Sequence, residues 1–130
     1  MKYALLAMVL FAGIFFSSCE KDPGEGGNAS VYGKIIVRDF RNDGTFKEQY
    51  PGIGENVYII YGTGNVPNDN IKAGIGGSYE FKYLRTGKYK IYALSEDSTK
   101  QSNALYTVVK EVEIKDNDQN LEVPAIVIYK

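Results

Sequence analysis

The residue of this chain best suited to do chemistry is its single cysteine, Cys19. The sequence contains no histidine and no tryptophan. The absence of histidine excludes histidine bases, histidine metal ligands, and the Ser-His-Asp and Cys-His catalytic groups. A lone cysteine excludes an internal disulfide. Its thiolate is the one strong nucleophile available, and the small Ser17 and Ser18 beside it let an extended backbone enter an enzyme cleft.

The residues before Cys19 have the layout of a secretory signal peptide. Lys2 supplies positive charge, residues 3–16 form an unbroken apolar or small run, and two serines follow. As a helix this run would span roughly 21 Å, which is short of the roughly 30 Å hydrocarbon core of a membrane. We therefore predict an export signal rather than a permanent transmembrane helix.

Phe16-Ser17-Ser18-Cys19 resembles the lipobox of bacterial lipoproteins, which more often has Leu at the first of these positions. The resemblance implies that residues 1–18 are a lipoprotein signal peptide and that diacylglycerol is attached to the Cys19 thiol, which becomes the mature N-terminus. Acyl chains at about 0.8 kcal/mol per buried methylene would hold the domain on a membrane. The alternative is a plain signal peptide with an incidental cysteine.

Residues 19–29 contain no large apolar side chain and are predicted to be a lipidated, flexible tether. The acidic residues after Cys19 resemble export signals that send lipoproteins to the outer face of some Gram-negative outer membranes. In other sorting systems an acidic residue here retains the protein at the inner membrane. We expect a cell-envelope protein anchored in the outer membrane of a Gram-negative bacterium, with the leaflet left open.

Three further patterns suggest chemistry in the remaining chain. Asp97-Ser98-Thr99 resembles a short acceptor motif for O-glycosylation, which makes Ser98 a candidate glycan site. Asp116-x-Asp118-x-Asn120 has the oxygen spacing of a calcium loop but lacks the turning glycine and the final glutamate, which favours a plain turn. Lys34 and Asn120 with Glu80 are imaginable partners for a self-formed isopeptide bond, although strand alternation places Lys34 and Glu80 outward.

Charge and composition exclude a second group of functions. Lys and Arg number 15 against 16 Asp and Glu, so the chain has no basic field to hold a phosphate backbone, and we expect no nucleic-acid partner. No cofactor, metal or catalytic residue is predicted. An enzyme that uses only two carboxylates, as glycosidases do, remains the enzymatic alternative.

From Ser30 onward, short segments rich in Val, Ile, Tyr and Phe alternate with Gly, Asn and Asp turns, which predicts an all-β sandwich or barrel. Residues 105–114 fit both a helix and a strand, and we favour a strand with a bulge near Val109-Lys110. Pro124 must lie at an edge or a bulge, because it has no N–H to donate. Seven strands are expected, near residues 31–38, 56–61, 71–73, 78–84, 88–94, 106–114 and 121–129.

Several segments carry a family resemblance, most specifically Gly77-Ser78-Tyr79-Glu80-Phe81 and Leu84-x-x-Gly87-x-Tyr89. With Val31-x-Gly33-Lys34-Ile35 before them, they resemble the carboxypeptidase regulatory-like domains and the collagen-adhesin B-type repeats. The resemblance implies a seven-stranded, transthyretin-like (prealbumin-like) Greek-key sandwich over residues 30–130, with scaffolding, accessory or adhesive work.

Independent physical reasons support some of these positions. Gly77 and Gly87 can take positive φ at chain reversals, and Tyr89 can bury its ring while its hydroxyl bonds to backbone. Alternation places Tyr32, Tyr58 and Tyr92 outward, where amphipathic rings suit a protein or glycan partner, although tyrosine also simply favours strands.

Taken together, the sequence predicts a lipid-anchored, non-enzymatic binding or structural module of the cell envelope. The membrane is its partner through Cys19, and a protein or glycan of the envelope is expected on the folded domain. The alternative is a glycan- or calcium-dependent ligand-binding module of the cell surface.

Overall fold

The structure is a computed structural model that describes residues 22–130, and the predicted signal peptide and Cys19 lie outside these residues. The described chain is all-β, with one short 3-10 turn. Its strands are β1 (Glu25–Phe40), β2 (Phe46–Pro51), β3 (Asn56–Tyr61), β4 (Asp69–Lys72), β5 (Ser78–Leu84), β6 (Gly87–Ser95), β7 (Tyr106–Ile114), β8 (Asn120–Glu122) and β9 (Ile126–Tyr129), and the turn η1 (Ile75–Gly77) precedes β5.

The described residues form nine strands instead of the expected seven. The segment after Asp39 forms the small hairpin for which Asn42-Asp43-Gly44 is the turn, and its second arm is β2. The expected last strand is divided into β8 and β9 by a break at Pro124, as the missing proline N–H requires. Both differences add short strands to one sheet and leave the all-β prediction confirmed.

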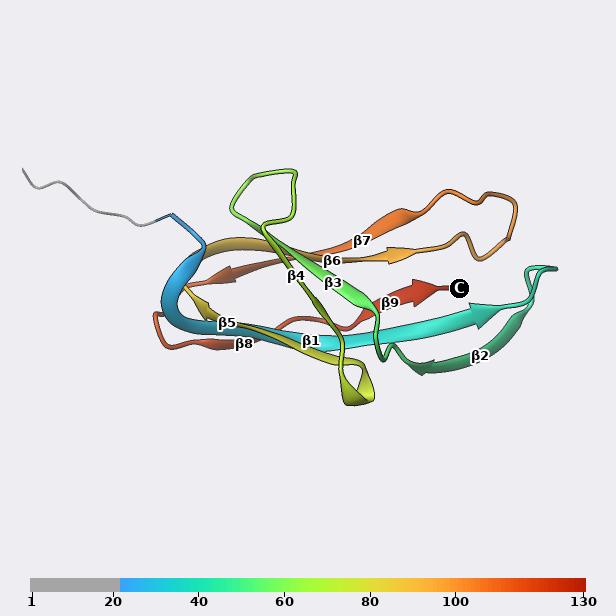
Figure 1. Ribbon diagram of the computed structural model, residues 1–130, viewed down its shortest axis with the longest axis horizontal. Helices are drawn as coiled ribbons and strands as arrows, with labels where there is room; N and C mark the ends of the chain where they lie inside the picture. Colours follow the sequence, from blue (N-terminus) through green and yellow to red (C-terminus); the bar gives the residue numbers. More distant parts are fainter. Residues whose placement is uncertain (1–21) are drawn as a thin grey trace, which may run out of the picture.

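The first sheet is built around the long strand β1 (Figure 1). Val31 pairs with Phe81 of β5 and with Leu121 of β8, so these two strands lie on opposite edges of β1. Farther along β1, the antiparallel β2 and the parallel β9 take the same two edges. β1 is therefore the central strand from Ser30 onward, whereas its first residues pair with β5 alone.

The second sheet has the order β4-β3-β6-β7 and is antiparallel throughout. The register between β6 and β7 runs without a shift from Gly87 opposite Ile114 to Ser95 opposite Tyr106. The predicted bulge near Val109-Lys110 is therefore wrong. Lys110 takes an ordinary position opposite Ile91 and is half-buried, because a lysine can lay its aliphatic stem along apolar surface and keep its charge in water.

The two sheets pack face to face, and alternate side chains of their strands fill the space between them. Alternation along β1 and β6 is confirmed, since their inward residues are almost completely buried. In β3, Val57 and Ile59 are buried as alternation requires, but Ile60 is buried as well and Tyr61 is only half-buried. The largest fully buried side chains are Tyr89, Ile35, Ile59, Leu84, Ile91, Ile114, Ile126, Ile128, Val31, Val37, Val57 and Val123. This continuous apolar layer holds the sandwich together.

Tyr83 is an exception to the predicted alternation. Alternation along residues 78–84 would place Tyr83 on the inward face with Tyr79 and Phe81, but Tyr83 is 70% exposed and has a φ of +61°. The pairing between β1 and β5 shifts register in this region, and Leu84 takes the buried place instead, with 1% exposure. The shift leaves a bulky residue in a backbone conformation that normally favours glycine.

The folded domain begins earlier than residue 30. Residues 25–29, assigned from the sequence to the tether, form the start of β1, and Ala29 is completely buried opposite Leu84. Gly24 also belongs to the folded domain, because its N–H donates a hydrogen bond to the Tyr89 hydroxyl at 2.8 Å. Among the described residues, no helix has the length and apolar character to cross a membrane.

Candidate functional site

The outer face of the second sheet brings together a row of side chains from all four of its strands. Tyr58 of β3 lies opposite Asn70 of β4 and Tyr92 of β6, and Tyr92 lies opposite Val109 of β7. Directly paired residues of an antiparallel sheet share one face, so these four side chains line up across the sheet. We call Asn70, Tyr58, Tyr92 and Val109 the tyrosine row.

The two rings of the tyrosine row are stacked. Their centroids are 4.9 Å apart and their planes differ by 14°. This separation is too short for coplanar rings lying side by side, so each ring turns one face toward the other. Burial and the neighbouring Tyr58 raise the pKa of Tyr92, so the Tyr92 phenol is a neutral hydrogen-bonding group at physiological pH. The pair offers two hydroxyls and two remaining ring faces.

Apolar side chains and a small groove adjoin the row. Leu94, Leu105 and Val109 are 37%, 58% and 43% exposed. The groove, about 270 Å³ in volume, shares Tyr58, Leu94 and Leu105 with this region and is lined also by polar residues of the strand ends. One wall carries an ion pair in which Lys130 Nζ lies 2.5 Å from Glu55 Oε1, and this hydrogen bond raises the pKa of Lys130.

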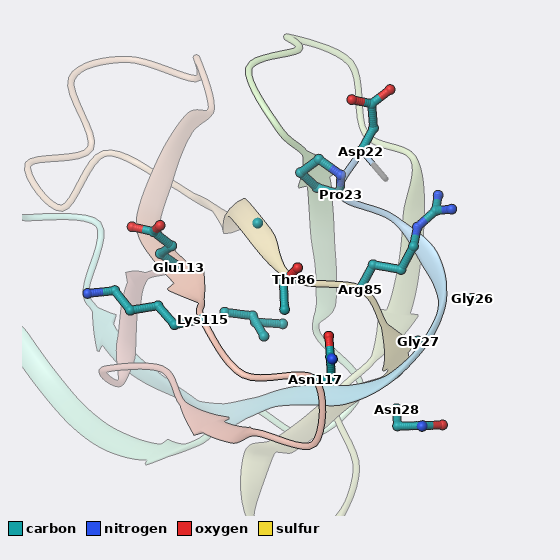
Figure 2. Close-up of a pocket in the computed structure, with 12 residues that line it drawn as sticks. Asp22, Pro23, Gly26, Gly27, Asn28, Arg85, Thr86, Glu113, Lys115 and Asn117 are labelled. Atoms are coloured by element: carbon teal, nitrogen blue, oxygen red, sulfur yellow. The ribbon is translucent and has the colours of Figure 1, made fainter. Parts of the chain in front are cut away.

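A second and larger groove, about 840 Å³, lies where the described chain begins. Thr86 and Asn117 project between its sides, with Asp22 and Arg85 on one side and Glu113 and Lys115 on the other (Figure 2). Both signs of charge are present on its walls, and no aromatic ring lines it. The groove is mainly polar, and Pro23 and Ile114 are the large apolar residues among those that line it.

The structure separates the three tyrosines that the sequence places outward. Tyr32 lies on β1 in the first sheet, opposite Glu80 and Glu122, whereas Tyr58 and Tyr92 lie together on the second sheet. Alternation correctly predicted that all three face outward. It carried no information about which strands are neighbours, and only strand pairing brings two of them into contact.

The other candidate residues lie apart from the tyrosine row. Cys19 lies outside the described residues. Ser98 is half-buried in a turn in which Asp97 accepts hydrogen bonds from the backbone and the hydroxyl of Thr99 at 2.9 and 2.7 Å. These bonds hold the pKa of Asp97 below its usual value.

The segment from Asp116 to Asn120 forms a turn, closed by Gln119 Oε1, which accepts from the Lys115 N–H at 3.0 Å. Asn120 accepts from the Ser30 hydroxyl at 2.6 Å. Lys34 is exposed and lies four residues farther along β1 than Ser30, so the structure does not bring Lys34 and Asn120 together. Within residues 22–130 no group of three or more Asp, Glu or Cys side chains is placed to hold a metal ion.

Comparison with known proteins finds a distant structural similarity. No protein-family model matches the chain, and no curated protein matches it. Among solved structures it is similar to a protein from Pseudomonas aeruginosa with a proposed carbohydrate-binding role, at 10% identity and a TM-score of 0.47, over 82% of this chain and 91% of that one. The described residues themselves define an all-β domain of two packed sheets with an aromatic outer face.

Proposed function

We propose that this protein is a lipid-anchored, non-enzymatic binding or structural module of the cell envelope, held in the outer membrane of a Gram-negative bacterium through Cys19. The observation that carries the binding role is the stacked pair Tyr58 and Tyr92 with exposed Leu94 and Val109 beside it. Tyrosine supplies large, rigid contact area at a low cost in side-chain entropy. An apolar surface rimmed by polar groups is typical of an interaction site.

The anchoring part of the proposal is supported by the lipobox-like sequence at Cys19. Processing there would leave residues 20 and 21 between the acylated cysteine and the first described residue. We further propose that the domain is a prealbumin-like sandwich. Positive φ at Gly77 and Gly87 and the buried, hydrogen-bonded Tyr89 support this, because the family motif uses these positions.

A position-specific crosslinking experiment tests the binding role. A photo-activated phenylalanine analogue would replace Tyr58 or Tyr92 in intact cells, and Tyr32, half-buried on the outer face of the other sheet, is the matched control. We expect defined adducts from positions 58 and 92 and none from position 32. Equal crosslinking at all three positions, or none at 58 and 92, would contradict the proposed surface.

A labelling experiment tests the anchor separately. Radiolabelled palmitate is expected to enter the protein and to be lost in Cys19→Ala. Intact cells treated with a membrane-impermeant reagent would report the leaflet. Incorporation of palmitate into Cys19→Ala at the level of the parent protein would contradict attachment at this residue.

The alternative is a glycan- or calcium-dependent ligand-binding module, and one observation favours its glycan form. Asn70 lies directly opposite Tyr58, so an amide that can bond sugar hydroxyls stands beside an aromatic ring. A bound oligosaccharide would raise the melting temperature, by mass action, in the parent protein and less in Asn70→Ala. Absence of any shift with a panel of envelope glycans, with and without calcium, would count against it.

A further inference from the structure

Tyr83 combines two features that the packing of the sandwich does not require. Its side chain is 70% exposed, and its φ is +61°. A bulky L-residue rarely adopts this conformation, which glycine adopts freely. The neighbouring Leu84 supplies the buried apolar contact. The ring of Tyr83 therefore contributes little to the hydrophobic core. Residues in strained backbone conformations of this kind cluster at functional sites.

Tyr83 lies at the end of the domain where the described chain begins. Leu84 pairs with Glu25, and the Arg85 N–H donates to the Gly24 carbonyl at 2.8 Å. The end of β5 and the start of β1 accordingly lie side by side (Figure 1). Covalent geometry limits the Cα atoms of Cys19 and Asp22 to a separation of about 11 Å, because three virtual bonds join them.

We propose that Tyr83 inserts its ring into the headgroup region of the membrane to which Cys19 is anchored. The proposal rests on the proposed anchoring, which brings this end of the sandwich to the lipid surface. Tyrosine is enriched at membrane interfaces, because its ring is apolar and its hydroxyl is hydrated. Lys82 is exposed and Arg85 half-exposed on either side of the Tyr83-Leu84 pair. Lys82 Nζ lies 3.3 Å from Glu80 Oε1 in a solvent-exposed ion pair, which is weak enough to open, and both cationic groups suit lipid phosphates.

Insertion would also fix the orientation of the domain. A lipid anchor alone allows the domain to rotate about the tether, whereas a second contact removes much of this freedom. The tyrosine row belongs to the other sheet of the sandwich. A domain resting on Tyr83 therefore leaves the tyrosine row free for a partner outside the membrane.

The absence of tryptophan from the chain makes a sharp test available. Tyr83→Trp introduces a single tryptophan, and Ile75→Trp provides the matched control. Ile75 is 92% exposed in the turn η1 at the opposite end of β5, about 20 Å along the strand. Each acylated full-length protein would be reconstituted into phosphatidylcholine vesicles with brominated acyl chains, and its fluorescence compared with that in unbrominated vesicles.

We expect a blue shift and strong quenching for Tyr83→Trp, and neither for Ile75→Trp. Vesicle flotation in the same samples reports anchoring independently. If both proteins float with the vesicles but the two tryptophans are quenched equally, or neither is quenched, the insertion of residue 83 is contradicted while the anchor stands. If the proteins do not float, the anchoring is contradicted and the insertion with it.

A second variant keeps the test valid if Tyr83→Trp does not fold. Lys82→Trp places the probe one residue earlier, at another exposed position of β5, and we expect quenching there as well. Cys19→Ala removes the acylated residue in either background, and loss of quenching is then expected. Quenching that survives Cys19→Ala would overturn the proposed dependence on the anchor.

Discussion

The hydroxyl of Tyr89 joins the beginning of the folded domain to the turn after β5. It accepts a hydrogen bond from the Gly24 N–H at 2.8 Å and donates one to the Arg85 carbonyl at 2.7 Å. Gly24 and Tyr89 are 65 positions apart in the sequence. The Tyr89 ring is 1% exposed, so one buried side chain holds the point at which the proposed tether enters the sandwich.

Tyr89→Phe is expected to destabilise the protein by about 1–3 kcal/mol, because it removes the hydroxyl that pairs the Gly24 N–H and the Arg85 carbonyl. Tyr79→Phe is the matched control. Tyr79 is also buried, but its hydroxyl has no hydrogen-bond partner among the described residues, so its removal should leave the stability unchanged or raise it. Urea unfolding measures both, and equal losses would contradict the assignment.

Gly33→Ala is expected to cost about 1–3 kcal/mol through overpacking. A Cβ at Gly33 would lie 2.7 Å from the Tyr79 hydroxyl oxygen and 3.1 Å from the Val123 carbonyl oxygen. Tyr79→Phe removes the closest atom, so the double variant should lose less stability than the sum of the single variants. Gly64→Ala, which meets only ordinary contacts, is the control, and strict additivity would rule out this clash.

Tyr83→Gly is expected to leave the free energy of unfolding unchanged or to raise it by up to about 1 kcal/mol, because glycine adopts a φ of +61° without strain. Leu84→Ala, one residue later, should cost about 2–5 kcal/mol because Leu84 is fully buried. Thermal unfolding compares the two. A large loss for Tyr83→Gly would mean that the ring supports the fold.

Alkaline pH is expected to destabilise the domain through its buried phenols. Burial and the nearby Glu25 carboxylate raise the pKa of Tyr61 to about 12, from 10.0 for the free group. Between these values the folded state keeps a proton that the unfolded chain has lost. The stability that the folded domain gains from this protonated phenol is therefore fully present below about pH 10 and is lost as the pH approaches 12. Burial also raises the pKa values of Tyr79 and Tyr89.

Urea unfolding at several pH values between about 9 and 12 measures how steeply the free energy of unfolding falls with pH. Tyr61→Phe should reduce the fall in stability without abolishing it, because the other two phenols remain. An identical pH dependence in Tyr61→Phe and the parent protein would show that Tyr61 does not contribute.

Three predicted strands have the bounds expected from the sequence, because residues 56–61, 78–84 and 106–114 form β3, β5 and β7. Within these strands the prediction was wrong at two positions. Lys110 interrupts an apolar pattern but not the backbone, whereas Tyr83 fits the pattern and yet takes a left-handed conformation.

Local alternation and residue counts were enough to predict an all-β domain, the apolar faces of most of its strands and the absence of histidine chemistry. The stacking of Tyr58 on Tyr92 with Tyr32 on the other sheet, and the place of Gly24 in the fold, became visible only in three dimensions. Such contacts depend on the order and register of strands distant in the sequence, and alternation along one strand does not specify its neighbours.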